Sequence, residues 1–183
     1  AVYAFMRECD DLSDGPRASA EAMAQWRADL DSTLAGTPAG HAIWPALLDT
    51  VERFRIPHRY LHEMIDGVQS DLTAHVFETF DELYRYCYLV ASVVGLTIIH
   101  IFEFEDPSAP ALAEKCGIAF QLTNIIRDAG EDQSMGRVYL PQEDLLRFGV
   151  ERLDRDTPEL RRLLAHYGAR ARAYYDEARP LVA

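Results

Sequence analysis

The sequence contains little cysteine. Its three cysteines, Cys9, Cys87 and Cys116, are odd in number and show no Cys-x-x-Cys spacing. Each lies in a stretch with a helical pattern of apolar residues, which argues against the disulfide framework of a small secreted domain. The cysteine content therefore favours a reducing compartment, and we expect a cytoplasmic protein.

Basic residues are scarce relative to acidic ones. The 183 residues include 18 Lys and Arg against 30 Asp and Glu, which gives a formal net charge of -12 at pH 7. This charge repels nucleic acid and anionic membrane surfaces unless cations intervene. We therefore expect no nucleic-acid partner.

Long apolar runs and nucleotide-binding motifs are also missing. The longest apolar run, Val90 to Phe102, is interrupted by His100 and is too short to span a bilayer. Residues 1–9 lack the basic start and apolar stretch of a signal peptide. No glycine-rich dinucleotide fingerprint occurs, so a reductive step that uses NADPH cannot be placed in this segment.

The sequence does contain helical periodicity along most of its length. With 49% hydrophobic residues the chain can bury a sizeable core, and we expect a single domain over residues 1–183. Apolar residues recur at helical spacing, and the breaks fall at glycine and proline. No long alternating strand pattern occurs, so the predicted class is all-α. The expected helices cover residues 2–14, 17–34, 41–54, 57–72, 80–104, 111–133, 141–148 and a last stretch from 158.

The two ends of the sequence suggest an internal segment of a longer protein. Residue 1 is not Met, and a helical pattern is already present at Val2 to Phe5. The last residues, Ala178 to Ala183, are not followed by a polar segment of the kind that usually ends a domain. We therefore expect both termini of the natural protein to lie outside this chain.

Two Asp-x-x-x-Asp pairs are the main candidate functional residues. Asp10 and Asp14 form the first pair, and Asp128 and Asp132 form the second. Residues four apart lie on one helix face, where like charges cost an isolated helix roughly 0.2–0.5 kcal/mol. A positive partner is therefore expected at each pair. The alternative is that both are solvated surface faces, which is the usual fate of acidic runs.

The surroundings of the two pairs favour a metal site over a solvated face. Each pair follows an arginine, Arg7 or Arg127, and borders an apolar helix. Carboxylates in that setting suit Mg²⁺, which binds through one or two carboxylates and keeps positions for phosphate oxygens. If the pairs face each other, Mg²⁺ can hold a diphosphate at the mouth of a hydrophobic cavity.

The residues around both pairs resemble the aspartate-rich motifs of squalene and phytoene synthases. The first motif is YAFMRECDDLSD at residues 3–14, and the second is QLTNIIRDAGED at residues 121–132, followed by GRVYLP at 136–141. The stretch YCYLVASVVG at residues 86–95 is similar to the central helix of that family. The resemblance covers nearly the whole chain and implies an isoprenoid-synthase-type helical bundle around a central cavity.

The resemblance also implies roles for individual residues. It assigns Mg²⁺, or Mn²⁺ in its place, to Asp10, Asp14, Asp128 and Asp132, and the substrate diphosphate to Arg7, Arg127, Arg137 and Tyr139. It places Tyr3, Tyr86, Gln121 and Asn124 at the reaction centre. The prenyl-tail pocket is expected along Val90, Ala91, Val94, Gly95, Ile98 and Gly117. For Gly117 and Gly95, close helix contact is the equally weighted alternative.

The implied reaction is a head-to-head condensation of two prenyl diphosphates. The stretches Leu61–Leu72 and Tyr86–Phe102 look more similar to bacterial squalene-type enzymes, which use farnesyl diphosphate, than to phytoene synthases, which use geranylgeranyl diphosphate. Phytoene synthesis is kept as the alternative. The residues do not identify the base that takes the proton. We also expect peripheral contact with a membrane for product release.

Other interpretations of the motifs remain open. A terpene cyclase or head-to-tail synthase would share the helical fold, but it would be expected to show DDxxD-type clusters instead of the second motif. A non-catalytic relative that acts as a binding or assembly factor should have lost acidic residues, whereas both pairs are intact. One departure from the family pattern is Glu103, which stands where a small residue such as Gly is expected.

Overall fold

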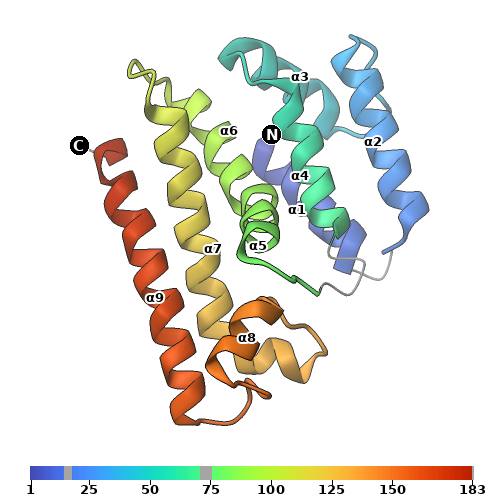
Figure 1. The fold of residues 1–183 in the computed structure, drawn as a ribbon. Coiled ribbons are helices and arrows are strands. Elements are labelled where there is room, and N and C mark those ends of the chain that lie inside the picture. The colour runs from blue at the N-terminus through green and yellow to red at the C-terminus, as the bar shows by residue number, and fades with distance from the viewer. Residues whose placement is uncertain (15–17, 71–75, 183) are drawn as a thin grey trace. The chain divides into compact units, whose positions relative to one another are not determined.

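The computed structural model describes residues 1–14, 18–70 and 76–182, and these stretches contain helices and no strand (Figure 1). The all-α class predicted from the sequence is therefore confirmed for the described residues. The helices are α1 Val2–Asp14, α2 Ala20–Leu34, α3 Ile43–Phe54, α4 His58–Ser70, α5 Phe80–Cys87, the π-helical turn η1 Tyr88–Ser92, α6 Val93–Phe102, α7 Ala109–Ser134, α8 Gln142–Phe148, α9 Pro158–Ala178 and the 3₁₀ turn η2 Arg179–Val182.

Helix starts are set by side-chain caps that the periodicity alone does not reveal. The start predicted at Arg17 lies outside the described residues. The observed helix begins at Ala20, because the Ser19 hydroxyl accepts a hydrogen bond from the Ala22 amide at 3.0 Å. In the same way the Thr157 hydroxyl accepts from the Leu160 amide at 3.1 Å, and Pro158 follows at the first helical position. The other predicted boundaries lie within two residues of the observed ones, except residues 71–72, which are outside the described residues.

The described residues group into two compact units. Unit 1 comprises Ala1–Thr73 and Leu96–Glu105, and unit 2 comprises Ala74–Gly95 and Asp106–Ala183. Each unit has its own buried core. A single domain over residues 1–183 stays a prediction.

The core of unit 1 is aromatic. The Trp26 ring lies 5.7 Å from Phe5 and 4.2 Å from Trp44, measured between ring centroids. Phe5 and Trp44 are fully buried, and the Trp26 indole N–H donates to the Cys9 sulfur at 3.1 Å. Burial of the thiol raises the pKa of Cys9 to about 12. Cys9 therefore packs as a small hydrophobic residue that joins α1 to α2.

The core of unit 2 forms where α7 and α9 lie side by side (Figure 1). Its buried residues include Leu122, Ile125 and Leu163, which come from these two helices. The short helix α8 joins this core through a buried carboxylate, because the Tyr167 hydroxyl donates to Asp144 Oδ2 at 2.7 Å. Burial of the phenol, and then this bond, raise the pKa of Tyr167. The segment after α7 is thus tied to α9.

A π-helical turn interrupts the central helical stretch from Phe80 to Phe102. A Cβ built on Gly117 of α7 would lie 2.3 Å from the Ser92 Cα atom, so only glycine fits where α7 meets η1. The Ser92 hydroxyl also donates to the Glu114 carbonyl at 2.7 Å. Close helix contact is therefore sufficient reason for Gly117, whereas Gly95 has an ordinary neighbour, the Ala113 carbonyl, at 3.6 Å.

The same stretch changes one expectation from the sequence. Because the helical residues run from Phe80 and not only from Val90, the stretch has 23 residues and is long and apolar enough to cross a membrane by length and composition. It is the single such helix among the described residues. The core helix of a soluble protein meets the same criteria, so this finding carries no assignment by itself.

The helix α6 ends at a strained residue. Glu103 has φ of 55°, in the left-handed region that favours glycine, and its amide donates to the His100 carbonyl at 3.3 Å. Arg55, which follows α3, has φ of 51°. The expected small residue at position 103 thus has a conformational reason, and the glutamate occupies a helix-ending position at a cost in stability.

Candidate active site

The second acidic pair lies on one face of α7. Gln121, Asn124, Asp128 and Asp132 follow each other at intervals of three and four residues, and all four are half-buried. The neighbouring face of the helix, which includes Ile118, Leu122, Ile125 and Ala129, is buried in the unit 2 core. The helix therefore brings these four predicted site residues into one polar row beside apolar core.

Within this row, Asp128 already has a cationic partner. The Arg127 guanidinium donates to both carboxylate oxygens of Asp128, from Nε at 2.7 Å and from Nη2 at 2.6 Å. This bidentate contact lowers the pKa of Asp128 below its usual value. The carboxylate is therefore held in its charged form, as a cation ligand must be.

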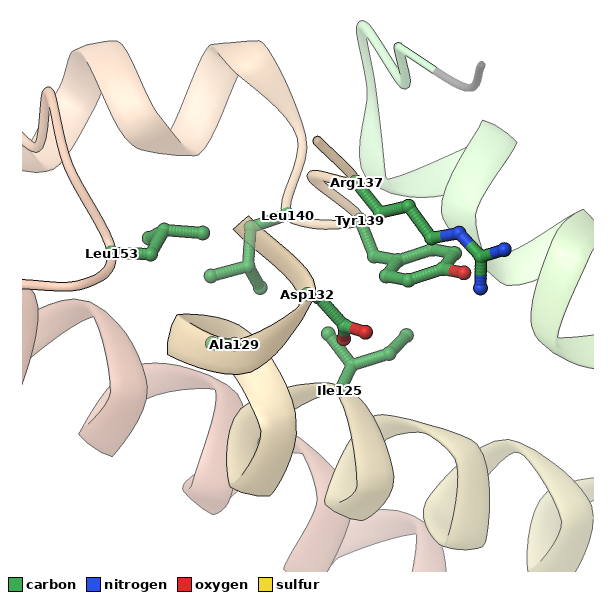
Figure 2. A pocket seen from close by; sticks show the side chains of 7 residues that line it. All are labelled: Ile125, Ala129, Asp132, Arg137, Tyr139, Leu140 and Leu153. Carbon is green, nitrogen blue, oxygen red and sulfur yellow. The ribbon is translucent and has the colours of Figure 1, made fainter. Parts of the chain in front are cut away.

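Asp132 lies in a small pocket at the end of the helix. Figure 2 shows Asp132, Arg137 and Tyr139 around this pocket, with its apolar wall formed by Ile125, Ala129, Leu140 and Leu153. The Arg137 amide donates to the Asp132 carbonyl at 2.8 Å, which turns the chain back over the helix end. Three of the predicted site residues, Asp132, Arg137 and Tyr139, thus line one pocket of unit 2.

Burial and the neighbouring charges shift the pKa of Asp132 in opposite directions. Burial and the charge of Asp128 raise the pKa of its carboxyl, whereas the charge of Arg137 lowers it. The net shift is upward. A cation placed between the two carboxylates would reverse this balance, because it favours the charged form of both.

An aromatic cluster extends the pocket towards the central helical stretch. The Tyr139 ring stacks on Tyr86 with centroids 5.3 Å apart and an angle of 25°, and it lies 6.4 Å from Phe77. Tyr86 and Phe77 are buried and 5.3 Å apart. The Gln142 amide fixes this arrangement by donating to the Phe77 carbonyl at 2.8 Å. The predicted reaction-centre residue Tyr86 therefore lies next to the predicted diphosphate ligand Tyr139.

The first acidic pair belongs to unit 1. Tyr3, Arg7 and Asp10 are exposed and lie on one face of α1, opposite the buried Phe5 and Cys9. Arg7 pairs with Asp11 at 2.8 Å across one helical turn. The backbone of Asp14 completes the helix, but its side chain is outside the described residues. The predicted metal and diphosphate roles of these residues stay predictions.

The predicted prenyl-tail residues other than Gly117 are incompletely covered, four of them in unit 2 and Ile98 in unit 1. Val90, Ala91, Val94 and Gly95 are half-buried, and 38% of Ile98 is exposed. Apolar side chains that are not enclosed within the described residues are compatible with the wall of a cavity. Gly117 differs from them because it is buried against Ser92.

The donor chemistry of α7 fits Mg²⁺ better than a metal that needs a full protein cage. No group of three or more His, Cys, Asp or Glu with metal-site geometry occurs among the described residues. Zinc requires three or four such ligands, whereas Mg²⁺ takes one or two carboxylates and completes its shell with water and phosphate oxygens. Asp128 and Asp132 supply such a donor set.

Some residues of the site were not predicted from the sequence. Ile125 and Leu153 line the pocket, and Phe77 belongs to the aromatic cluster beside it. Gln133 hydrogen-bonds to the loop that carries Leu153. Ile125 and Gln133 lie inside or beside the second motif, so proximity to it was a usable signal. Nothing in the sequence connects Phe77 or Leu153 to that motif, because both are brought to it by tertiary packing.

Comparison with known proteins identifies similar sequences over the whole chain. The sequence model described as squalene/phytoene synthase matches residues 1–183. Phytoene synthase 3, chloroplastic, from Zea mays is 40% identical over 191 residues, which cover 97% of this chain and 45% of the relative. Phytoene synthase 2, chloroplastic, from Solanum lycopersicum is 39% identical over 192 residues, covering 97% and 61% respectively.

Two solved structures have the same fold as this chain. A dehydrosqualene synthase in complex with ligand superposes with a TM-score of 0.89 at 35% identity, covering 97% of this chain and 64% of that one. The squalene synthase HpnC from Alicyclobacillus acidocaldarius superposes with a TM-score of 0.90 at 31% identity, covering 98% and 70%. The chain spans about half the length of several of the curated relatives that it matches.

Proposed function

The chain belongs to the squalene/phytoene synthase family, and from this premise we propose that the protein is a Mg²⁺-dependent prenyltransferase that condenses two prenyl diphosphates head to head. The observation that carries the proposal is the pocket of unit 2. Asp132, Arg137 and Tyr139 line this pocket together with apolar residues, and the Tyr139 ring stacks on Tyr86. Such a set combines a cation ligand, phosphate donors and an aromatic face.

Residues of α7 and its following segment have complementary roles in this proposal. Asp128 and Asp132 hold Mg²⁺, which when bound neutralises the diphosphate leaving group. Arg137 donates hydrogen bonds to phosphate oxygens through its guanidinium, and the Tyr139 hydroxyl adds another donor. Arg127 orders the Asp128 carboxylate through its bidentate contact and is proposed as a further diphosphate ligand.

Residues of α1 are proposed to act in the same reaction. Asp10 and Asp14 are cation ligands, and Arg7 is a diphosphate donor that now pairs with Asp11. Tyr3 is 79% exposed, so its ring is available to a substrate. The proposal therefore requires both acidic pairs.

The remaining residues protect and steer the reacting carbon skeleton. Loss of the diphosphate leaves an allylic carbocation, which the faces of Tyr86 and Tyr3 can stabilise by roughly 0.5–2 kcal/mol each. Gln121 and Asn124 lie on the same row as the acidic pair and orient the substrate through their amides. The surface of Val90, Ala91, Val94, Gly95 and Ile98 is proposed to hold the prenyl tail and exclude water.

Two substrates are compatible with this chemistry. Farnesyl diphosphate, which would give presqualene diphosphate or squalene, is the first candidate, and the structural neighbours are named as squalene and dehydrosqualene synthases. Geranylgeranyl diphosphate is the second candidate, favoured by relatives that are named as phytoene synthases. We propose no role for NADPH in this segment.

The test is turnover by the intact protein. Each prenyl diphosphate is supplied separately with Mg²⁺, and products are identified by mass spectrometry before and after addition of NADPH. A head-to-head product with one substrate and Mg²⁺ dependence are expected. Tight binding of both substrates without any product would instead support the non-catalytic relative, and a head-to-tail or cyclised product would support the other prenyl synthases.

The proposed setting is a reducing compartment with access to a membrane. The three cysteines are free, and Cys9 and Cys87 are buried. The plant relatives are named as chloroplastic, which is a property of those proteins. A peripheral membrane contact would allow an apolar product to leave the protein, and cosedimentation with liposomes tests it.

A further inference from the structure

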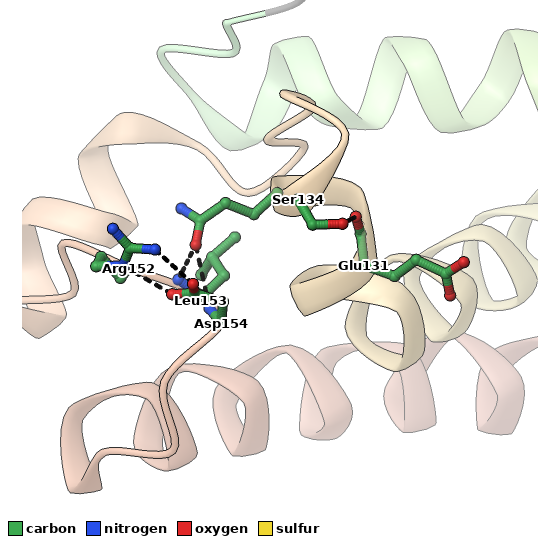
Figure 3. Close-up of polar contacts among 6 residues, drawn as sticks. Glu131, Ser134, Arg152, Leu153 and Asp154 are labelled. Atoms are coloured by element: carbon green, nitrogen blue, oxygen red, sulfur yellow. Dashed lines mark hydrogen bonds and ion pairs between the residues drawn. The ribbon is translucent and has the colours of Figure 1, made fainter.

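One side chain holds the end of α7 against the loop between α8 and α9. The Gln133 Oε1 atom accepts hydrogen bonds from two backbone amides, Leu153 at 2.7 Å and Asp154 at 3.1 Å. Figure 3 marks the Arg152–Asp154 ion pair, whose Nε–Oδ1 distance is 2.8 Å, beside Leu153. The loop is thus bonded both to α7 and within itself.

The packing between α7 and this loop is close. A Cβ built on Gly130 would lie 3.4 Å from the Leu153 carbonyl oxygen and 3.8 Å from the Asp154 Cα atom. The backbone of the loop therefore runs directly over the last turns of the helix. At this distance the two hydrogen bonds to Gln133 fix where the loop lies along the helix.

The position of the loop bears on the pocket. Leu153 is buried and forms part of the pocket wall, and Asp132 is the residue before Gln133. The Gln133 side chain therefore connects the turn that carries Asp132 to a residue of the pocket wall. Without the Oε1 acceptor, two amides would lose their partner, and the loop would be free to move towards water.

We propose that Gln133 is a positioning residue for the cation ligand Asp132, and this inference rests on the proposed function. By holding Leu153 against the helix end, Gln133 keeps the Asp132 carboxylate in one orientation before the cation arrives. Partners that orient a metal ligand typically change metal affinity by about 10–100-fold when they are removed. Gln133 should consequently act on the Mg²⁺ requirement more strongly than on the chemical step.

The experiment compares three substitutions in the intact protein. Gln133→Met keeps the length and loses the acceptor, whereas Gln133→Glu keeps an acceptor for both amides. Thr157→Ala is the matched control for lost stability, because it removes another side-chain acceptor of a backbone amide near the same loop. If Gln133→Met does not fold, Gln133→Asn retains the amide on a side chain one methylene shorter and replaces it.

Three quantities are measured for each variant. They are the Mg²⁺ concentration that gives half-maximal turnover, kcat at saturating Mg²⁺, and hydrogen–deuterium exchange of the Leu153 and Asp154 amides. For Gln133→Met we expect the half-maximal Mg²⁺ concentration to rise about 10-fold with kcat changed less than about 3-fold, and both amides to exchange faster. Gln133→Glu should need no more Mg²⁺ than the wild type, and Thr157→Ala should leave the Mg²⁺ requirement unchanged.

Several outcomes would overturn the proposal. An unchanged Mg²⁺ requirement in Gln133→Met, despite faster amide exchange, would reduce Gln133 to a structural contact while leaving the proposed function intact. Equal shifts in Gln133→Met and Thr157→Ala would mean that lost stability causes the effect. A wild-type protein without any Mg²⁺-dependent turnover would overturn the proposed function, and this inference with it.

Discussion

The two acidic pairs share a sequence pattern but differ in their structural surroundings. In α1, Tyr3 and Asp10 are exposed, and Arg7 pairs with a residue of its own helix. In α7, the corresponding face is half-buried, and its last carboxylate lies in a pocket built by residues up to Leu153. The comparison shows that a motif fixes which residues share a helix face, whereas segments elsewhere in the chain decide how strongly that face is supported.

The largest expected effect on turnover is at the acidic pair of α7, Asp128 and Asp132. Asp128→Asn should lower kcat by about two orders of magnitude, because it removes a cation ligand while relieving the repulsion with Asp132 that is present without metal. Asp156→Asn is the matched control, since Asp156 is also paired with an arginine, Arg161, but does not line the pocket. Steady-state kinetics and a thermal melt of each variant provide the measurement. Near-normal turnover in Asp128→Asn with an unchanged Tm would contradict the metal assignment.

A second substitution tests the packing that supports α7. Gly117→Ala should destabilise the protein by roughly 1–3 kcal/mol or more, because the new Cβ would overlap the backbone of Ser92. Gly168→Ala in α9 is the control, because no atom lies within 4 Å of its Cβ position. That change should stabilise the helix by about 0.5–1 kcal/mol. Urea unfolding distinguishes the two, and equal effects would rule out close contact as the reason for Gly117.

Ligand-dependent melting tests whether the acidic pair of α1 binds ligands together with the acidic pair of α7. Mg²⁺ and inorganic diphosphate added together should raise the Tm of the intact protein by more than the sum of their separate effects, because each supplies the counter-charge of the other. A ligand at 100 times its Kd adds about 2.7 kcal/mol of stability. Asp10→Asn and Asp128→Asn should each remove the excess. An excess that survives in Asp10→Asn would show that the α1 pair is a solvated surface.

The smallest expected effect concerns how the two units end their helices. Glu103→Gly should stabilise the protein by about 0.5–1 kcal/mol, because glycine adopts the left-handed conformation without strain. Gly149, which ends α8 with φ of 70°, is the reciprocal case, and Gly149→Ala should destabilise by about 1 kcal/mol. Both values come from denaturant unfolding. A destabilised Glu103→Gly variant would indicate that the glutamate side chain makes a contact worth more than the strain.

The helices, the all-α class and the two acidic pairs of the candidate site could be predicted from the sequence alone. Periodic apolar residues and the breaks at glycine and proline depend only on local chemistry, so the predicted helices agree with the observed ones to within a few residues. The acidic pairs and their arginines were also visible, because i, i+4 spacing places residues on one face whatever the rest of the chain does. The small residue expected at position 103 came from the family resemblance, and the φ angle of 55° gives its physical reason.

Tertiary structure alone decided which of these residues meet in unit 2. Tyr86 and Tyr139 are stacked although they lie far apart in the sequence, and Phe77 and Leu153 join the site through packing that no local pattern encodes. The role of Gln133 also depends on distance, because a glutamine after an acidic pair gains a structural role only where two backbone amides come within reach of its oxygen. Local periodicity determines faces, whereas contacts between distant segments depend on the packing of whole helices.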